Sequence, residues 1–234
     1  MDIIGKSKIW FVFSGMLCTL SIIFLIIWGL KPGIDFTGGS LLRVEFTEQK
    51  LSNDQIREVF SDTEQWGSVT SQEVGNKEFI VRLKTLDEAK HQEALQKLQQ
   101  KLDESTGGAE NPEISSKNLV KEIKFDSIGP SIGRELRQKS TLSVIFVLLA
   151  IVAYIAWAFR GVATGISKYE SFIYGLFALV ALLHDVLVVL GLFAFLGHFY
   201  NVEVDTFFIA ALLTILGYSV NDTIIIFDRI RENM

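Results

Sequence analysis

The sequence predicts a multi-pass α-helical membrane protein that carries one extracytoplasmic α+β domain. Hydrophobic residues make up 49% of the 234 residues, and they gather in long apolar segments on both sides of one charged block. Within that block the apolar residues recur with the periods of short strands and amphipathic helices. We therefore expect three parts, namely an N-terminus with the first transmembrane helix (1–30), the extracytoplasmic domain (31–133), and transmembrane helices two to four (134–234).

The first apolar segment, residues 9–30, contains about 22 apolar or small residues, which is enough for one membrane span. Lys6 and Lys8 precede it, as basic residues precede the apolar part of a signal peptide. The segment is too long for that part, however, and no small-residue cleavage motif follows it. We interpret it as an uncleaved membrane anchor.

Residues 31–40 follow with the sequence KPGIDFTGGS, in which a proline and three glycines prevent the helix from continuing. A glycine pair near an aspartate also occurs in phosphate-binding loops, but no Lys-Ser or Lys-Thr pair follows it here. The segment is instead typical of a tight turn that leads out of the membrane into a strand.

The charged block has the periodicity of a soluble domain. We expect strands at 41–46, 67–74, 78–84 and 119–128, and helices that begin near Ser52 and cover 85–105. This order of strands and helices is the ferredoxin-like βαββαβ plan. Because its charged residues and His91 are expected on solvated helix faces, we predict a docking or peptide-gripping surface and no catalytic site.

Gly129 to Gly133 are expected to break the chain before a second span at about 141–159. A polar loop at 160–170, a third span at about 171–196 and a fourth span after residue 205 follow. The short loops on one side carry basic residues, which are Lys6, Lys8, Arg160, Lys168, Arg229 and Arg231. The loop at 198–205 carries none, so the positive-inside rule puts both chain ends in the cytoplasm and the folded domain outside.

The fourth apolar segment is unusual because it contains Asp222. A carboxylate in the hydrocarbon costs about 2.5–3.5 kcal/mol, so it normally faces protein or water. One side of this helix, within roughly 100°, is shared by Thr214, Tyr218, Asn221, Asp222 and Ile225. That side is either a polar packing seam between helices or a place where Asp222 moves ions or protons.

The third span contains a second carboxylate, Asp185, next to His184. Counting residues from the cytoplasmic ends of the two spans separates Asp185 from Asp222 by roughly 10 Å in depth. We therefore expect two steps along a path, or one functional and one structural carboxylate, and not a pair that shares one proton. A helix-packing role for His184 and Asp185 is the alternative.

Four motifs together are similar to those of a known family. They are GIDFTGGS at 33–40, SIGPSIG at 127–133, ALLHDV at 181–186 and LGYSVNDTIIIFDRIREN at 216–233. They resemble the SecF group of the SecD/SecF family, within the RND superfamily. The resemblance implies a bacterial inner-membrane complex with SecD and the SecYEG channel, often with YajC. Such a complex uses the proton-motive force to promote late stages of the translocation of unfolded polypeptides and their insertion into the lipid membrane.

The same resemblance assigns roles to residues of the fourth and third spans. It implies that Asp222 is the proton-relay aspartate, with Asp185, Tyr218, Ser219 and Asn221 as candidate supporting residues. SecF proteins have six spans and a relay arginine in the fifth, whereas this sequence ends at Met234 after four. We therefore expect a fragment or an incomplete chain, for which autonomous proton coupling is not expected.

Other functions are less consistent with the sequence. A structural adaptor that bridges SecD and SecYEG without proton coupling is the alternative function. A drug exporter of the wider superfamily would need larger domains than one of roughly 90 residues. No nucleophile, base and oxyanion donor can be assembled into an active site. The lone Cys18 and the scattered His91, His184 and His198 indicate no metal site or cofactor.

Overall fold

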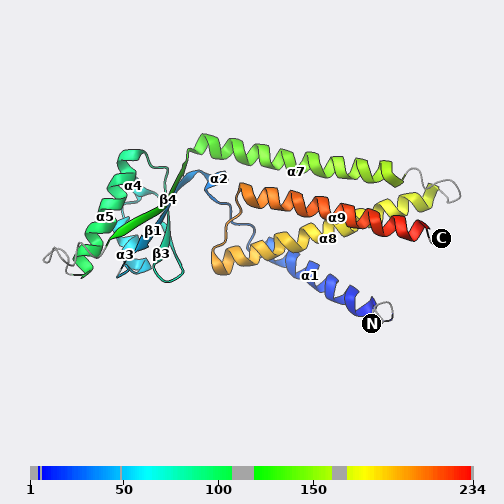
Figure 1. Ribbon diagram of the computed structural model, residues 1–234, viewed down its shortest axis with the longest axis horizontal. Helices are drawn as coiled ribbons and strands as arrows, with labels where there is room; N and C mark the ends of the chain where they lie inside the picture. Colours follow the sequence, from blue (N-terminus) through cyan, green and yellow to red (C-terminus); the bar gives the residue numbers. More distant parts are fainter. Residues whose placement is uncertain (1–4, 6, 48, 107–118, 160–167, 233–234) are drawn as a thin grey trace. The chain divides into compact units, whose positions relative to one another are not determined.

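The computed structural model describes residue 5 and residues 7–47, 49–106, 119–159 and 168–232. The chain forms two compact units, one of Met1–Pro32 with Gln138–Met234 and the other of Gly33–Arg137. We call the first the helical unit and the second the sheet unit, and Figure 1 shows their elements. Most of the polar loop expected at 160–170 lies outside the described residues.

Four described helices are long and apolar enough to cross a membrane. They are α1 (Ser7–Ile27), α7 (Pro130–Phe159), α8 (Lys168–Tyr200) and α9 (Thr206–Glu232). Each corresponds to one of the four apolar segments of the sequence. The prediction of a multi-pass helical membrane protein is therefore confirmed.

The beginning of α7 corrects one expectation from the sequence. We expected Gly129 to Gly133 to break the chain and the second span to start near residue 141, but α7 begins at Pro130 and is continuous to Phe159. Proline is well suited to the first position of a helix, because that position needs no N–H donor and the proline φ is already helical. Gly133 lies in the first turn, where its N–H donates to the carbonyl oxygen of Gly129 at 3.0 Å.

The sheet unit contains one sheet of four antiparallel strands in the order β2-β3-β1-β4. The strands are β1 (Gly39–Phe46), β2 (Thr70–Val74), β3 (Glu78–Leu83) and β4 (Val120–Ile128). The two main helices are α3 (Asn53–Val59) and α5 (Glu88–Thr106). This arrangement confirms the ferredoxin-like plan, to which the structure adds a short helix that the sequence did not predict, α4 (Thr63–Trp66).

The core of the sheet unit is built from alternate strand residues and from one side of each helix. In β1, Leu42, Val44 and Phe46 are fully buried and alternate with half-buried residues. The helices contribute Ile56, Trp66, Ala94, Leu98 and Leu102 to the same cluster. Ser52 caps α3 through the expected capping box with Gln55. The unit therefore has a complete hydrophobic core of its own.

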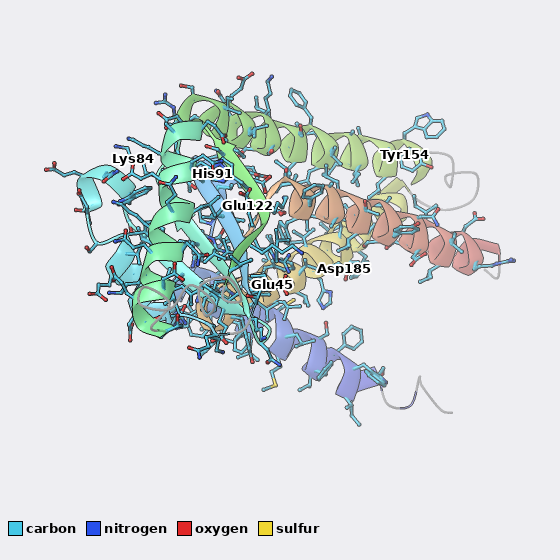
Figure 2. The ribbon with its side chains drawn as sticks, turned by 60° about the vertical axis from the view of Figure 1, so that its left-hand side comes forward. Glu45, Lys84, His91, Glu122, Tyr154 and Asp185 are labelled. Carbon is cyan, nitrogen blue, oxygen red and sulfur yellow. The ribbon has the colours of Figure 1, made fainter. Side chains whose placement is uncertain are left out.

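His91 was expected on a solvated helix face, and that prediction is wrong. The side chain is only 5% exposed, and its ring stacks on Phe125 of β4 with 3.8 Å between ring centroids. Figure 2 shows it facing Glu122, whose Oε2 lies 3.0 Å from His91 Nε2. His91 lies three residues before Ala94 and seven before Leu98, so the helix period puts it on the side that contacts the sheet.

The glycine-rich turn after α1 folds around a short helix, α2 (Ile34–Thr37). Gly38 and Gly39 have positive φ angles of 75° and 129°, which side chains other than glycine rarely tolerate. A Cβ atom on Gly133 would lie 2.8 Å from the backbone nitrogen of Gly38. The glycines therefore allow the turn to contact the first turn of α7 at backbone distance.

Candidate functional site

The candidate site lies in the helical unit, where α8 packs against both α1 and α9 (Figure 1). Between α8 and α9 lies a buried cluster of Ala178, Leu182, Leu216 and Val220, which also includes Ile155 of α7. This packing fixes which side of α9 faces α8. The side of α9 that carries Ser219 is directed toward α8, and the side that carries Asp222 is not.

Polar side chains connect three helices through three consecutive hydrogen bonds. Ser14 Oγ in α1 lies 2.7 Å from His184 Nε2 in α8. His184 Nδ1 lies 2.9 Å from Oδ1 of the adjacent Asp185. Ser219 Oγ in α9 donates to Asp185 Oδ2 at 2.6 Å. We call these four residues the interhelical chain, and Figure 2 labels one of them, Asp185.

Asp222 has a different environment from Asp185. It lies on the exposed side of α9 with Tyr218, Asn221 and Ile225, and the Tyr218 side chain is 70% exposed. Asp222 makes no hydrogen bond or ion pair with any residue that the structure describes. The prediction that these residues share one side of the helix is therefore correct. This side of α9 does not contact α8.

The structure brings only some of the predicted site residues together. Asp185 and Ser219 are directly hydrogen-bonded, whereas no hydrogen bond among the described residues joins Asp185 to Asp222. Ser219 precedes Asp222 by three residues, or about 4.5 Å along the helix axis. Because Asp185 contacts Ser219, the depth separation of roughly 10 Å expected from counting residues is too large. That the two carboxylates do not share one proton stays a prediction.

Sequence reasoning did not find Ser14. It is one of several small polar residues in the first apolar segment, and its role depends on its position opposite His184. The sequence contains one indication of this contact. Ser14 and Ser21 in the first span are seven residues apart, and so are His184 and Gly191 in the third span. Two helices that run in the same direction can form paired contacts at such positions, but the sequence alone does not say which helices are neighbours.

Basic residues lie only toward the ends of the described membrane-spanning helices. Lys8 is at the start of α1, Arg134 and Arg137 are near the start of α7, and Arg229 is near the end of α9. No described Lys or Arg forms an ion pair with Asp185, whose partners are His184 and Ser219. Among the described residues, neither Asp185 nor Asp222 is therefore neutralised by a Lys or Arg side chain.

Aromatic residues gather where α1 ends beside the end of α8. The rings of Trp28 and His198 stack with 4.6 Å between centroids, and the cluster extends to Phe24, Phe195 and Phe199. Lys31 Nζ donates to Asn201 Oδ1 at 2.9 Å just beyond the rings. Such a combination of aromatic and polar groups is typical of a membrane–water interface. His198 lies in the last turn of α8.

The fold and the site define a multi-pass membrane protein with a folded domain after its first span and carboxylates within later spans. Two family models match the chain, one of protein export membrane protein SecD/SecF, C-terminal (residues 111–234), and one of the SecD/SecF GG motif (residues 23–50). The chain belongs to the SecD/SecF family. This confirms the resemblance seen in the motifs, and the GG model covers the turn built on Gly38 and Gly39.

Individual relatives agree with the family models. The chain is 35% identical to a protein translocase subunit SecF from Anaerolinea thermophila and covers 100% of itself and 69% of that relative. For the corresponding subunit from Thermobaculum terrenum the identity is 36%, with 100% and 70% covered.

Solved structures of SecDF show the same fold. The crystal structure of SecDF, a translocon-associated membrane protein from Thermus thermophilus, matches with a TM-score of 0.73 at 27% identity. A second structure of SecDF, in a super-membrane-facing form, matches with a TM-score of 0.52. The chain is covered completely in both matches, but it spans only 28% of each SecDF chain.

Proposed function

We propose that this chain acts as a SecF-like subunit of the Sec protein-export machinery. In this role it works with SecD and SecYEG, often together with YajC. It promotes the late stages of the translocation of unfolded polypeptides through SecYEG and their insertion into the membrane. The proposal is supported by the relatives named protein translocase subunit SecF and by the fold shared with SecDF. The proton-motive force drives this transport. The protein is a transport component and not an enzyme.

The position of Asp222 is the observation that supports proton coupling. Its carboxyl group projects from the exposed side of a membrane-spanning helix, beside Tyr218 and Asn221. An ionised carboxylate there is costly unless it meets protein or water, so a change of its surroundings changes whether it holds a proton. One charge that crosses the membrane gains about 2.3 kcal/mol per 100 mV, which is enough to shift a packing equilibrium of α9.

The proposed topology places both chain ends in the cytoplasm and the sheet unit outside the bacterial inner membrane. Basic residues near the start of α1 and the end of α9 support this orientation, as does the lack of Lys and Arg in the loop at 198–205. Protonation of Asp222 would then alter the packing of α9 and move the sheet unit, which would grip or release an emerging polypeptide.

A structural adaptor that bridges SecD and SecYEG is the second candidate. It is favoured by the interhelical chain, whose hydrogen bonds through His184 and Asp185 link three helices as a packing role would require. In this case Asp222 would only contact neighbouring helices of the assembled translocase.

The substitution Asp222→Asn in the full-length protein separates the two functions. We expect it to remove the part of protein export into inner-membrane vesicles that depends on the proton gradient, while copurification with SecD is unchanged. Asp205→Asn is a matched control, because Asp205 Oδ1 accepts from the N–H of Phe208 at the start of α9 and an asparagine can do the same. Full gradient-dependent export by the Asp222→Asn protein would leave only the adaptor function.

A further inference from the structure

The interhelical chain has the connectivity of a proton-exchanging group, and the proton relay proposed for Asp222 does not use it. Ser14, His184 and Asp185 are connected in the order that a serine hydrolase uses. Ser14 cannot act in that way, because it lies within α1, where the backbone N–H groups around it are used by the helix and cannot form an oxyanion hole. The chain therefore needs a different explanation.

We propose that Ser14, His184, Asp185 and Ser219 form a second protonatable site, distinct from Asp222, whose protonation state sets how α1 and α9 are held to α8. The site exchanges a single proton with water or with a neighbouring group, and no covalent bond other than those to that proton is made or broken. This inference does not depend on proton relay by Asp222.

The deprotonated site has one consistent arrangement of donors. An ionised Asp185 offers only acceptors, so His184 Nδ1–H donates to one oxygen and the Ser219 hydroxyl donates to the other. The neutral imidazole then has a free lone pair on Nε2, to which the Ser14 hydroxyl donates. All three hydrogen bonds are satisfied, and they point toward Asp185 from α1 and from α9.

One additional proton reverses or weakens a hydrogen bond between helices. On His184 Nε2, the proton would turn the ring into a donor, so the Ser14 hydroxyl would have to donate elsewhere, for example to the carbonyl four residues before it. On Asp185, the proton would either take the lone pair that Ser219 uses, so that Ser219 must accept, or lie on another lone pair and weaken the hydrogen bond from Ser219 by removing the negative charge. The protonation state is therefore transmitted to α1, to α9 or to both.

Asp185 is accessible and is not held in an ion pair with a described Lys or Arg. The side chains of Asp185 and His184 are 43% and 34% exposed in the helical unit, so the pair is accessible from outside its own helices. No basic side chain described on the neighbouring helices pairs with Asp185. The ionisable side chains described on or next to those helices are Lys8 and Cys18 in α1, Tyr218, Asp222, Asp228 and Arg229 in α9, Asp205 just before α9, and Arg134, Glu135, Arg137, Lys139 and Tyr154 in α7.

Of these groups, Asp222 is the one that the structure connects most directly to the site. It is three residues from Ser219 on the same helix, and the adjacent Thr223 hydroxyl donates to the carbonyl oxygen of Ser219 at 2.9 Å. Asp222 therefore lies next to the residue that α9 contributes to the interhelical chain, and the substitutions Asp185→Asn and Asp222→Asn test the two sites separately.

Infrared difference spectroscopy of the full-length protein in its complex with SecD tests the proposal directly. Spectra recorded between acidic and neutral buffers report the carbonyl band of each protonated carboxyl group. We expect a band that is lost in Asp185→Asn, shifted in frequency in Ser219→Ala, and kept in Asp222→Asn. A spectrum that is identical in the wild type and in Asp185→Asn would overturn the proposal. Loss of export in Asp222→Asn concerns only the proposed function and leaves this result unaffected.

A second measurement separates proton exchange from a purely structural role. Cys18, one helical turn after Ser14, reports the packing of α1 when it is the single cysteine of the full-length protein. We expect its rate of alkylation to change with pH by a step that occurs in the wild type and is absent in Asp185→Asn, since the asparagine cannot change its charge. If both proteins give parallel pH profiles, the interhelical chain is a packing contact and the proposal is wrong.

Discussion

Gly191 of α8 and Ser21 of α1 are in contact so close that a Cβ atom on Gly191 would lie 2.2 Å from the Cβ atom of Ser21. Small residues at such crossings let two membrane helices approach at backbone distance. Ser14 and His184 lie seven residues earlier on the same two helices and are hydrogen-bonded. The small pair therefore sets the distance at which the hydrogen bond of the interhelical chain can form.

The first prediction is that Gly191→Ala destabilises the packing of α1 on α8. The added methyl group has no space, and overpacking of this kind costs about 1–3 kcal/mol. The free energy of unfolding of the full-length protein in mixed micelles measures the effect. Gly217→Ala is the control, because a Cβ atom there meets nothing within 4 Å. Equal stability of the two variants would show that α1 and α8 are not packed in this way.

The four spans, and the order of strands and helices in the sheet unit, could be predicted because each depends on the pattern of apolar residues within a short segment. A long apolar segment spans a membrane wherever its neighbours lie, and alternation within a strand does not depend on its partner. The start of α7 was missed because glycine and proline break a helix in its interior but suit its first turn. The residue composition of this segment does not determine at which residue the first turn of α7 begins.

The interhelical chain and the burial of His91 could not be predicted for a different reason. The helix wheel correctly placed Tyr218 and Asp222 on one side of α9, but it does not say which side meets another helix. Ser219 became informative only because α8 puts Asp185 opposite to it. His91 is buried because β4, some 30 residues later in the chain, supplies Phe125 as a stacking partner.

The second prediction concerns Ser40, a fully buried serine in β1. Its Oγ accepts from the N–H of Leu86 at 2.8 Å and donates to Ser127 Oγ at 2.9 Å, and Ser127 Oγ donates to the carbonyl oxygen of Leu86 at 3.0 Å. In Ser40→Ala the N–H of Leu86 loses its partner in a dry site, which costs about 1–3 kcal/mol. The loss should appear as a lower midpoint of urea unfolding.

Urea unfolding is measured on a fragment of residues 33–137. We expect this fragment to fold alone, because the core cluster of the sheet unit lies entirely within it. Ser127→Ala is the comparison, since Ser127 is exposed and water can replace its hydroxyl group. We expect Ser40→Ala to be the more destabilising substitution. A neutral effect of Ser40→Ala would mean that the closed set of hydrogen bonds contributes no stability.

The third prediction is a pH dependence that originates at Glu93 in α5. The hydrogen bond from Gln65 Nε2 to Glu93 Oε1, at 2.9 Å, lowers the pKa of this carboxyl group below its ordinary value of 4.5, and Lys97 acts in the same direction. Because the folded state favours the ionised form, the contribution to stability is complete above pH 4.5 and is lost as the pH falls through the lowered pKa.

In Gln65→Met the donor is removed at similar volume, so the pKa of Glu93 should rise toward its ordinary value. The variant fragment should be less stable than the wild-type fragment at neutral pH, and the difference should narrow in acid, where Glu93 is protonated in both folded and unfolded chains. Carbon NMR titration of the Glu93 carboxyl group and urea unfolding at the two pH values measure both effects. Gln96→Met, at an exposed position of the same helix, should change neither. An unchanged pKa of Glu93 in Gln65→Met would show that α4 and α5 are not joined by this hydrogen bond in solution.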